Sequence, residues 1–172
     1  MNDDKKATIK ALIVSSIGFT FLFGVIISFI NGINYAFVAA PIAGLLWGIL
    51  IYFFFNSKKV KQHTQITGVE ESDIIYAGGA NHFKNAEAVG GKLYLLKDKL
   101  EFRSHGFNIQ NHSFNIDLNE MEEIIFFNTL GLIPNGLKLK LKAGDEEKFV
   151  VNNRNTWKSA IEQQIEHYKK AG

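Results

Sequence analysis

Residues 11–55 read ALIVSSIGFTFLFGVIISFINGINYAFVAAPIAGLLWGILIYFFF, a stretch of 45 residues without a formal charge. A helix of about 20 residues crosses a hydrocarbon core of roughly 30 Å. The stretch contains one tight-turn signal, Asn31-Gly32-Ile33-Asn34, which divides it into the segments 11–30 and 35–55. The sequence therefore predicts an N-terminal transmembrane α-hairpin. A cleaved signal peptide and one long buried helix are the alternatives, but a second full-length apolar segment does not normally follow a signal peptide.

Lysines on both sides of the uncharged stretch predict its orientation. The turn between the two segments has no cation, whereas lysines flank both outer ends, at Lys5, Lys6, Lys10, Lys58, Lys59 and Lys61. Cytoplasmic flanks of membrane spans carry an excess of such cations. We therefore expect an integral membrane protein in which residues 1–10, the C-terminus and the C-terminal domain are cytoplasmic.

Small residues recur at every fourth position in both segments. We call these sets the small-residue ladders: Ser16, Thr20, Gly24 and Ser28 in the first segment, and Ala36, Ala40, Gly44 and Gly48 in the second. Residues at this spacing share a helix face and allow another backbone to approach closely. We expect the two helices to pack through the ladders, with homodimerisation through one ladder as the alternative.

The rest of the chain has the pattern of a β domain. Residues 56–72 are predicted to be a basic and polar linker, and residues 73–172 a folded domain. Leucine and lysine alternate over 137–142, which is the period of a half-buried strand. Further strands are expected at 74–77, 92–96, 99–103, 114–118, 124–127 and 148–151, with loops at 78–90, 105–112 and 128–136. An apolar stripe that begins at Trp157 predicts an amphipathic helix over 155–170, anchored by Trp157.

Residues 89–104, VGGKLYLLKDKLEFRS, contain a glycine pair, then Tyr94-Leu95, then Leu100-x-Phe102. This pattern resembles the signature that opens GRAM domains, and the similarity extends over about 74–168. The resemblance implies a PH-like fold, with six to seven antiparallel strands capped by one C-terminal helix. It also implies a non-catalytic module that binds membrane lipids or proteins.

Composition and motifs exclude several other functions. The chain has no cysteine, which excludes disulfides, thiolate metal sites and cysteine nucleophiles, and a formal charge of +2 argues against nucleic acid as a partner. No phosphate-binding or nucleophile motif occurs, so we predict no enzyme activity and no cofactor. Gly78-Gly79 and Gly90-Gly91 are interpreted as bends or bulges. The carboxylates at 120–123 and 145–147 are interpreted as solvated turns.

Three histidines, His82, His105 and His112, fall in predicted loops. They lack the spacing of metal ligands, so we predict no metal site and expect them to hydrogen-bond to backbone or water.

Basic side chains give the main functional lead. The candidate lipid or partner contacts surround the first predicted hairpin or alternate along 137–142: Lys84, Lys92, Lys97, Lys99, Arg103, Lys138, Lys140 and Lys142. Such a face could attract an anionic leaflet, although alternating lysines also simply keep a strand soluble. Glu101 stands where phosphoinositide-binding PH-like domains have a basic residue, so tight inositol-phosphate recognition is not expected.

Two loops are further candidates. Asn108, Gln110, Asn111 and His112 offer hydrogen-bond donors and acceptors to a head group or a peptide, or else cap turns. Residues 129–136 are apolar for a loop. We expect this loop to tuck into the core, and the alternative is that it presents Leu130, Leu132 and Ile133 to a partner or a bilayer.

The sequence thus favours a membrane-anchored, non-enzymatic binding or scaffolding module whose cytoplasmic domain recognises anionic lipid or a protein partner. A homo-oligomeric membrane organiser assembled through the ladders is the alternative, and an unrecognised enzyme is a lesser one.

Overall fold

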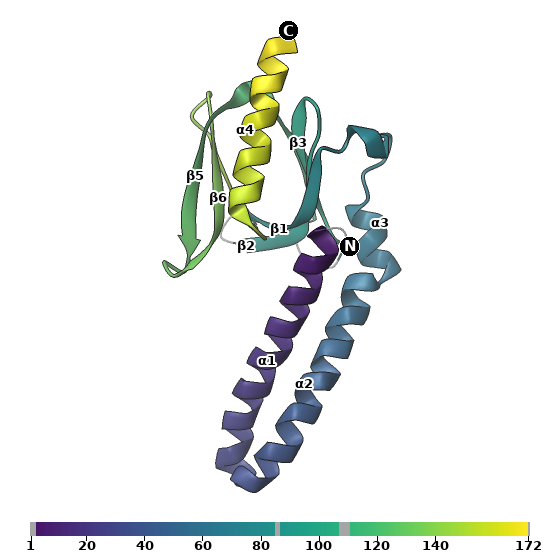
Figure 1. Cartoon of the computed structure of the whole chain (residues 1–172), viewed down its shortest axis with the longest axis vertical. Helices are drawn as coiled ribbons and strands as arrows, with labels where there is room; N and C mark the ends of the chain where they lie inside the picture. The colour runs from purple at the N-terminus through teal and green to yellow at the C-terminus, as the bar shows by residue number, and fades with distance from the viewer. Residues whose placement is uncertain (1–2, 85–86, 107–110, 172) are drawn as a thin grey trace. The chain divides into compact units, whose positions relative to one another are not determined.

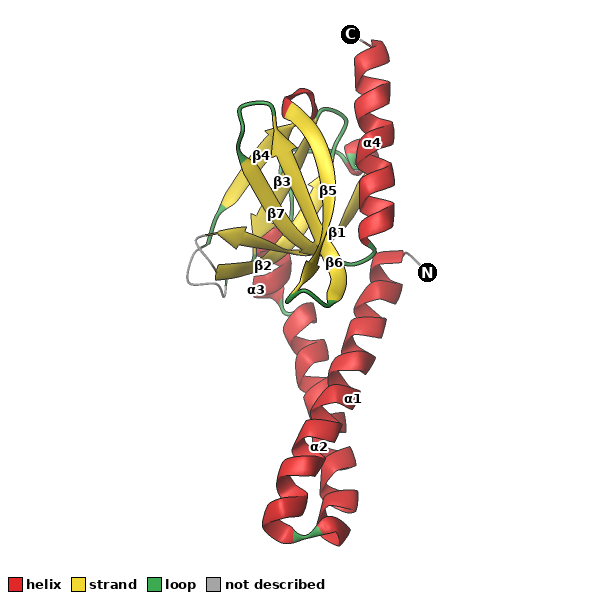
Figure 2. Ribbon diagram, turned by 90° about the vertical axis from the view of Figure 1, so that its left-hand side faces the viewer, coloured by secondary structure: helices red, strands yellow, loops and turns green. Residues whose placement is uncertain are grey.

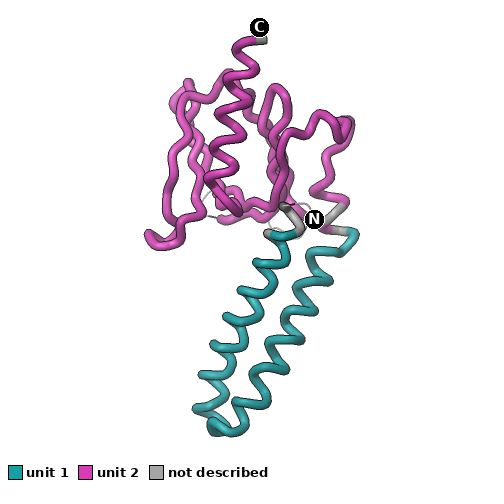
Figure 3. The backbone as a smooth tube through the Cα atoms, in the orientation of Figure 1, with its two compact units in different colours: residues 1–58 teal, residues 59–172 magenta. Residues whose placement is uncertain are grey.

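The computed structural model describes residues 3–84, 87–106 and 111–171 (Figure 1). The chain divides into two compact units, Met1–Lys58 and Lys59–Gly172 (Figure 3).

The first unit is a pair of helices, α1 (Asp3–Asn31) and α2 (Ile33–Asn56), which lie side by side in Figures 1 and 2. They are separated by Gly32 alone, whose φ of +86° suits a residue without a side chain. Thr8–Asn31 and Ile33–Asn56 are long and apolar enough to cross a membrane, by length and composition only. The two predicted helices are present but longer than 11–30 and 35–55, because the turn takes one residue instead of four and α1 begins at Asp3.

The second unit is a β domain with one long helix. Its elements are α3 (Lys58–Thr64), η1 (Glu71–Asp73), β1 (Tyr76–Lys84), β2 (Glu87–Leu95), β3 (Lys99–Ser104), β4 (Ser113–Asp117), η2 (Leu118–Glu120), β5 (Met121–Thr129), β6 (Ile133–Leu141), β7 (Glu146–Val151) and α4 (Arg154–Ala171). All neighbouring strands are antiparallel, in the order β4-β3-β2-β1-β7-β6-β5. Figure 2 shows the sheet curled around a common interior with α4 beside it. The prediction of six to seven antiparallel strands and one C-terminal helix is confirmed, with seven strands.

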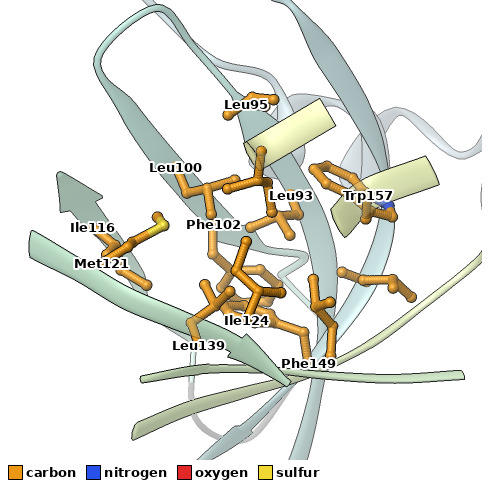
Figure 4. Packing of buried hydrophobic residues seen from close by; sticks show 14 of the residues in the cluster. Leu93, Leu95, Leu100, Phe102, Ile116, Met121, Ile124, Leu139, Phe149 and Trp157 are labelled. Carbon is orange, nitrogen blue, oxygen red and sulfur yellow. The ribbon is translucent and has the colours of Figure 1, made fainter. Parts of the chain in front are cut away.

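One hydrophobic cluster fills the curled sheet (Figure 4). Leu137 and Leu139 point into it, as the alternation in β6 predicts. Trp157 in the first turn of α4 is 1% exposed and packs edge-on against the ring of Tyr76, with 4.6 Å between the centroids. Burying a side chain of this size contributes roughly 3 kcal/mol or more. The predicted role of Trp157 as the anchor of this helix is confirmed.

The predicted loop at 78–90 is wrong, because two paired strands run through the glycine pairs. β1 continues through Gly78-Gly79 and β2 through Gly90-Gly91, and the residues of both strands pair one to one without a shift in register. These glycines are therefore neither bulges nor strand ends. At Gly91 the reason for a glycine is steric, because a Cβ atom there would overlap the carbonyl oxygen of Arg103 on the neighbouring strand β3.

The predicted linker 56–72 is also partly structured. It contains α3 and the start of η1, and Val60 and Thr64, four residues apart on α3, are buried. The Tyr94 hydroxyl donates a hydrogen bond of 2.7 Å to the carbonyl of Thr64, and Arg103 Nη1 donates one of 3.1 Å to the carbonyl of Gln65. Residues 64 and 65, at the end of α3, are therefore hydrogen-bonded to β2 and β3.

Candidate functional site

The lysines of β6 are paired with acidic side chains on the neighbouring strands. Lys138 Nζ donates a hydrogen bond of 2.8 Å to Glu146, and Lys140 Nζ lies 3.1 Å from a carboxylate oxygen of Glu122. The hydrogen bond from Lys138 lowers the pKa of Glu146, with smaller contributions from other lysines nearby. Lys142 is exposed at the end of the strand. The predicted basic stripe is therefore a mixed-charge face.

The basic residues around the β2–β3 hairpin are also paired. Arg103 Nε donates a hydrogen bond of 2.6 Å to Glu101, which is 5% exposed, and Lys99 lies 3.8 Å from the same carboxylate. Lys97 donates a hydrogen bond of 2.5 Å to Asp73, which raises the pKa of Lys97. The carboxylate of Glu101 therefore neutralises the guanidinium of Arg103.

Lys92 and Lys84 differ from the other candidate basic residues. The ammonium of Lys92 lies over the ring of Tyr94, 5.2 Å from its centroid. Lys84 is the last residue of β1, and its side chain lies outside the part of the chain that the structure describes.

Net charge agrees with this pairing. The unit Lys59–Gly172 contains 15 lysines and arginines and 15 aspartates and glutamates, so its formal charge is zero and the +2 of the chain resides in Met1–Lys58. A neutral domain gains little long-range attraction to an anionic membrane surface.

The histidines form a polar cluster that the sequence did not reveal. His82 is in β1, not in a loop, and is 4% exposed. Its Nε2 lies 2.6 Å from the carboxylate of Glu147, and its Nδ1 lies 2.8 Å from Nε2 of His112. The imidazole of His82 thus links the carboxylate of Glu147 to the ring of His112. The expectations of a loop at His82 and of a solvated turn at Glu147 were both wrong, because these residues lie in β1 and β7.

This chain of hydrogen bonds satisfies polar groups inside an aromatic environment. The ring of His82 packs among Phe102, Phe114 and Phe149, with centroids 4.6 to 5.5 Å apart. Among the described residues no group of three or more acidic or histidine side chains is placed to hold a metal ion. The hydrogen bonds of this cluster therefore offset the cost of burying the ring nitrogens of His82, because a buried polar group without partners is costly.

The asparagine-rich loop is described only at its end. Asn108 and Gln110 lie outside the described residues, whereas Asn111 is exposed. The amide nitrogen of His112 donates a hydrogen bond of 2.9 Å to the hydroxyl of Ser104, and that hydroxyl lies 3.5 Å from the side-chain oxygen of Asn111. Asn111 and His112 are thus held against the end of β3.

His105 begins the same connection. Its amide nitrogen donates a hydrogen bond of 3.1 Å to the carbonyl of Gly90, and burial lowers the pKa of its imidazole.

The apolar loop is corrected in both length and position. It is a short turn between β5 and β6, and Leu130 and Leu132 at its tip are 85% and 83% exposed, with Ile133 also exposed. The preferred expectation of a tucked loop was wrong. The turn cannot fold back, because the strands on either side are paired up to Thr129 and Ile133.

The small-residue ladders face each other across α1 and α2. A Cβ atom on Gly44 would overlap the hydroxyl of Thr20, and one on Gly48 would lie 2.6 Å from the hydroxyl of Ser16. A Cβ atom on Gly24 would lie 3.2 Å from that of Ala40. The same contact buries Ala36 in α2, while Ser28, nearer the turn, donates its hydroxyl proton to the carbonyl of Val25 in its own helix.

No protein-family model and no curated protein matches the sequence. Among solved structures, the C-terminal domain of an unknown protein from Leishmania infantum is 18% identical, over 54% of this chain and 83% of that chain, with a TM-score of 0.48. The N-terminal PH domain of Vps36 is 13% identical, over 65% of this chain and 92% of that one, with a TM-score of 0.49. The linker and DH/PH domains of p115-RhoGEF are 8% identical, over 80% and 47%, with a TM-score of 0.42. Likeness of this degree carries no inference about a ligand or a partner.

Proposed function

We propose that the chain is a membrane-anchored, non-enzymatic binding module. In this proposal α1 and α2 each cross the membrane once, both termini are cytoplasmic, and Lys59–Gly172 is a PH-like domain of the GRAM type. The length and apolar character of the helices, the lysines on their outer flanks and the GRAM-like pattern over 89–104 support it. So does the strand order with its single C-terminal helix.

The short connection between the units is the observation on which the proposal rests most. α2 ends at Asn56, and the carbonyl of Thr64, eight residues later, accepts a hydrogen bond from Tyr94 of β2. Eight residues span at most about 28 Å. A domain tethered so closely to a span stays at the membrane surface, where its effective concentration for anything on that surface is high.

A protein partner is the binding target that the charges favour. The domain has no net charge, and most of the candidate cations already have acidic partners, so recognition of an anionic head group would first have to break those pairs. A protein partner can instead be recognised through shape and neutral hydrogen bonds. The small-residue ladders contact each other within one chain, so we do not propose the homo-oligomeric organiser.

The membrane part of this proposal is tested by cysteine accessibility. The chain has no cysteine, so each introduced one is a unique label site. In intact cells, an impermeant maleimide should label an Asn34→Cys variant and should leave a Ser72→Cys variant unlabelled until the membrane is opened. Equal labelling of both variants in intact cells would contradict the topology.

The binding part is tested by site-specific crosslinking of the full chain in native membranes. A photo-crosslinker at the exposed Asn111 is compared with one at the exposed Asn119 of η2. We expect a defined protein adduct from position 111 and none from position 119. A lipid adduct at 111 would replace the protein partner by a head group, and the absence of any adduct specific to 111 would reject recognition through this loop.

A further inference from the structure

The β5–β6 hairpin has an uncharged, apolar end. Residues 124–137, fourteen in succession between Glu123 and Lys138, carry no charge. Leu130 and Leu132 at the tip are almost fully exposed. A surface feature of this kind normally marks a contact with something apolar.

The conformation of the tip makes a leucine there unfavourable for the hairpin itself. Leu130 and Gly131 have φ of +53° and +73°, and the amide nitrogen of Leu132 donates a hydrogen bond of 3.1 Å to the carbonyl of Thr129. These are the features of a type I′ turn, which favours Asn-Gly because both central residues have positive φ. A leucine in the left-handed region is strained. Since hairpin stability gives no reason for leucine at this position, the strain points to a role outside the hairpin.

The polarity of the hairpin changes in steps away from its tip. Behind the leucines come Thr129 and Asn135, whose side chains are joined by a hydrogen bond of 2.6 Å from the threonine hydroxyl. One residue further back, Arg154 Nη1 donates hydrogen bonds to the carbonyl of Phe127, at 2.7 Å, and to the side chain of Asn128, at 3.1 Å.

Arg154 and Lys158 together form a cationic collar at the base of the exposed part of the hairpin. The guanidinium of Arg154 lies over the ring of Phe126, 4.7 Å from its centroid, and the ammonium of Lys158 lies 5.2 Å from the same centroid. Lys158 also donates a hydrogen bond of 3.0 Å to the carbonyl of Ile124, and its ammonium lies 3.6 Å from the carboxylate of Glu162.

This order of groups matches the order of layers at a bilayer surface. Apolar side chains suit the acyl boundary, amides and hydroxyls the interfacial layer, and a cation the phosphate level. Three strand residues from the tip to Asn128 cover about 10 Å, which is comparable with the depth at which interfacial segments are buried. A soluble protein partner would not require this graded polarity.

We propose that the tip of the β5–β6 hairpin inserts into the interface of the bilayer that anchors the chain, with Leu130 and Leu132 in the acyl boundary and the cationic collar at the phosphates. This inference rests on the proposed membrane anchoring. Two leucines hold a free domain on a membrane only weakly, but the short connection from Asn56 to Thr64 keeps the domain near the surface, so that weak insertion is sufficient. Insertion gives the domain a second contact with the membrane and thereby fixes which of its faces looks toward the cytoplasm.

The test uses the full chain in proteoliposomes, with an environment-sensitive fluorophore on one introduced cysteine. Ile133→Cys reports on the tip and leaves both leucines in place. Asp145→Cys, in the exposed turn between β6 and β7, is the matched control, and Leu46→Cys, on an exposed face of α2, reports on the membrane span. Lipids that carry a spin label on the acyl chain quench only fluorophores that reach the acyl region.

We expect a blue-shifted and strongly quenched probe at positions 133 and 46, and an aqueous, unquenched probe at position 145. Adding Leu130→Asn to the Ile133→Cys variant should reduce the ratio of inserted to free hairpin about tenfold, because it removes one buried leucine. Asparagine suits the turn, so this variant keeps its fold.

Each other outcome overturns the inference in a recognisable way. Quenching at position 46 without quenching at 133 would leave the anchoring intact and reject insertion. A blue shift at 133 without quenching by lipid would mean that protein, either a partner or a second copy, covers the tip. An unquenched probe at 46 would reject the anchoring, and insertion with it.

Discussion

Replacing Gly91 by alanine should destabilise the β domain, whereas the same change at Gly79 should not. Both residues lie in paired strands, where alanine is favoured over glycine by about 0.5–1 kcal/mol. At Gly79 an added Cβ meets nothing within 4 Å. At Gly91 it overlaps the carbonyl oxygen of Arg103 and lies 2.7 Å from the ring of Phe102 and 2.8 Å from Cα of Ser104. Two of these three contacts are backbone, which cannot rotate away.

The expected changes in the free energy of unfolding follow from this difference. Overpacking typically costs 1–3 kcal/mol, so we expect a net loss of about 2 kcal/mol for Gly91→Ala and a gain of about 0.5 kcal/mol for Gly79→Ala. For a domain of this size, these values correspond to roughly 10 °C lower and 2–3 °C higher melting temperatures. Gly78→Ala is a further control, because its Cβ would lie at an ordinary contact distance of 3.5 Å from Trp157.

The assay is thermal unfolding of the purified full chain in detergent, followed by the fluorescence of Trp157. Trp47, the other tryptophan, is replaced by phenylalanine in every variant, so that the signal reports on the β domain alone. A Gly91→Ala protein as stable as its parent, or an equal loss for Gly79→Ala, would refute the close strand approach inferred here.

Three further predictions follow from the same structure. Leu130→Asn should stabilise the β domain by about 1 kcal/mol in a chemical denaturation curve, because it relieves the left-handed leucine, and Leu132→Asn should give no such gain. Gly44→Leu should lower the temperature at which the helical circular-dichroism signal of the hairpin melts in detergent, whereas Gly18→Leu, whose Cβ meets nothing within 4 Å, should leave that temperature unchanged. Because burial lowers the pKa of His105, the unfolded chain binds its proton more readily, so stability should fall as the pH drops below about 6.5 toward the pKa of the folded state. His105→Gln should flatten the melting temperature over that interval, and an unchanged pH profile would show that another group is responsible.

Several elements could be predicted because their signals are local. Alternation over 137–142 predicts the β6 strand, the spacing of apolar residues from Trp157 onward predicts α4, and the turn signal at residues 31–34 predicts the reversal at position 32. In each case one chemical property with one period determines the element.

The errors have a common cause, which is that the decisive neighbour lies far away in the sequence. The sequence favoured a bend or bulge at Gly90-Gly91, whereas Gly91 is a glycine because the backbone of β3 leaves no room for a side chain. The partner of His82 is Glu147, 65 residues later, and no spacing rule connects them. The lysines of β6 suggested a basic face because their acidic partners belong to other strands.

The exposed tip was misjudged for a different reason. Apolar content alone favours burial, but the turn between β5 and β6 is too short to fold back over its own strands. Pairing up to Thr129 and Ile133 therefore forces the leucines outward. A sequence pattern indicates whether a segment favours water or an apolar environment. Only the strand pairing shows whether the segment can reach that environment.

Gly32 is the only residue between the two helices. If these helices cross a bilayer as proposed, almost no polypeptide protrudes on the far side. A soluble ligand or a folded receptor on that side then has almost no surface to bind. Any signal that acts on this protein must then come from the composition or thickness of the lipid bilayer, or from the side of the membrane on which the β domain lies. We expect short epitope tags inserted at Gly32 to be tolerated, because a Cβ atom at this position would meet no other atom within 4 Å.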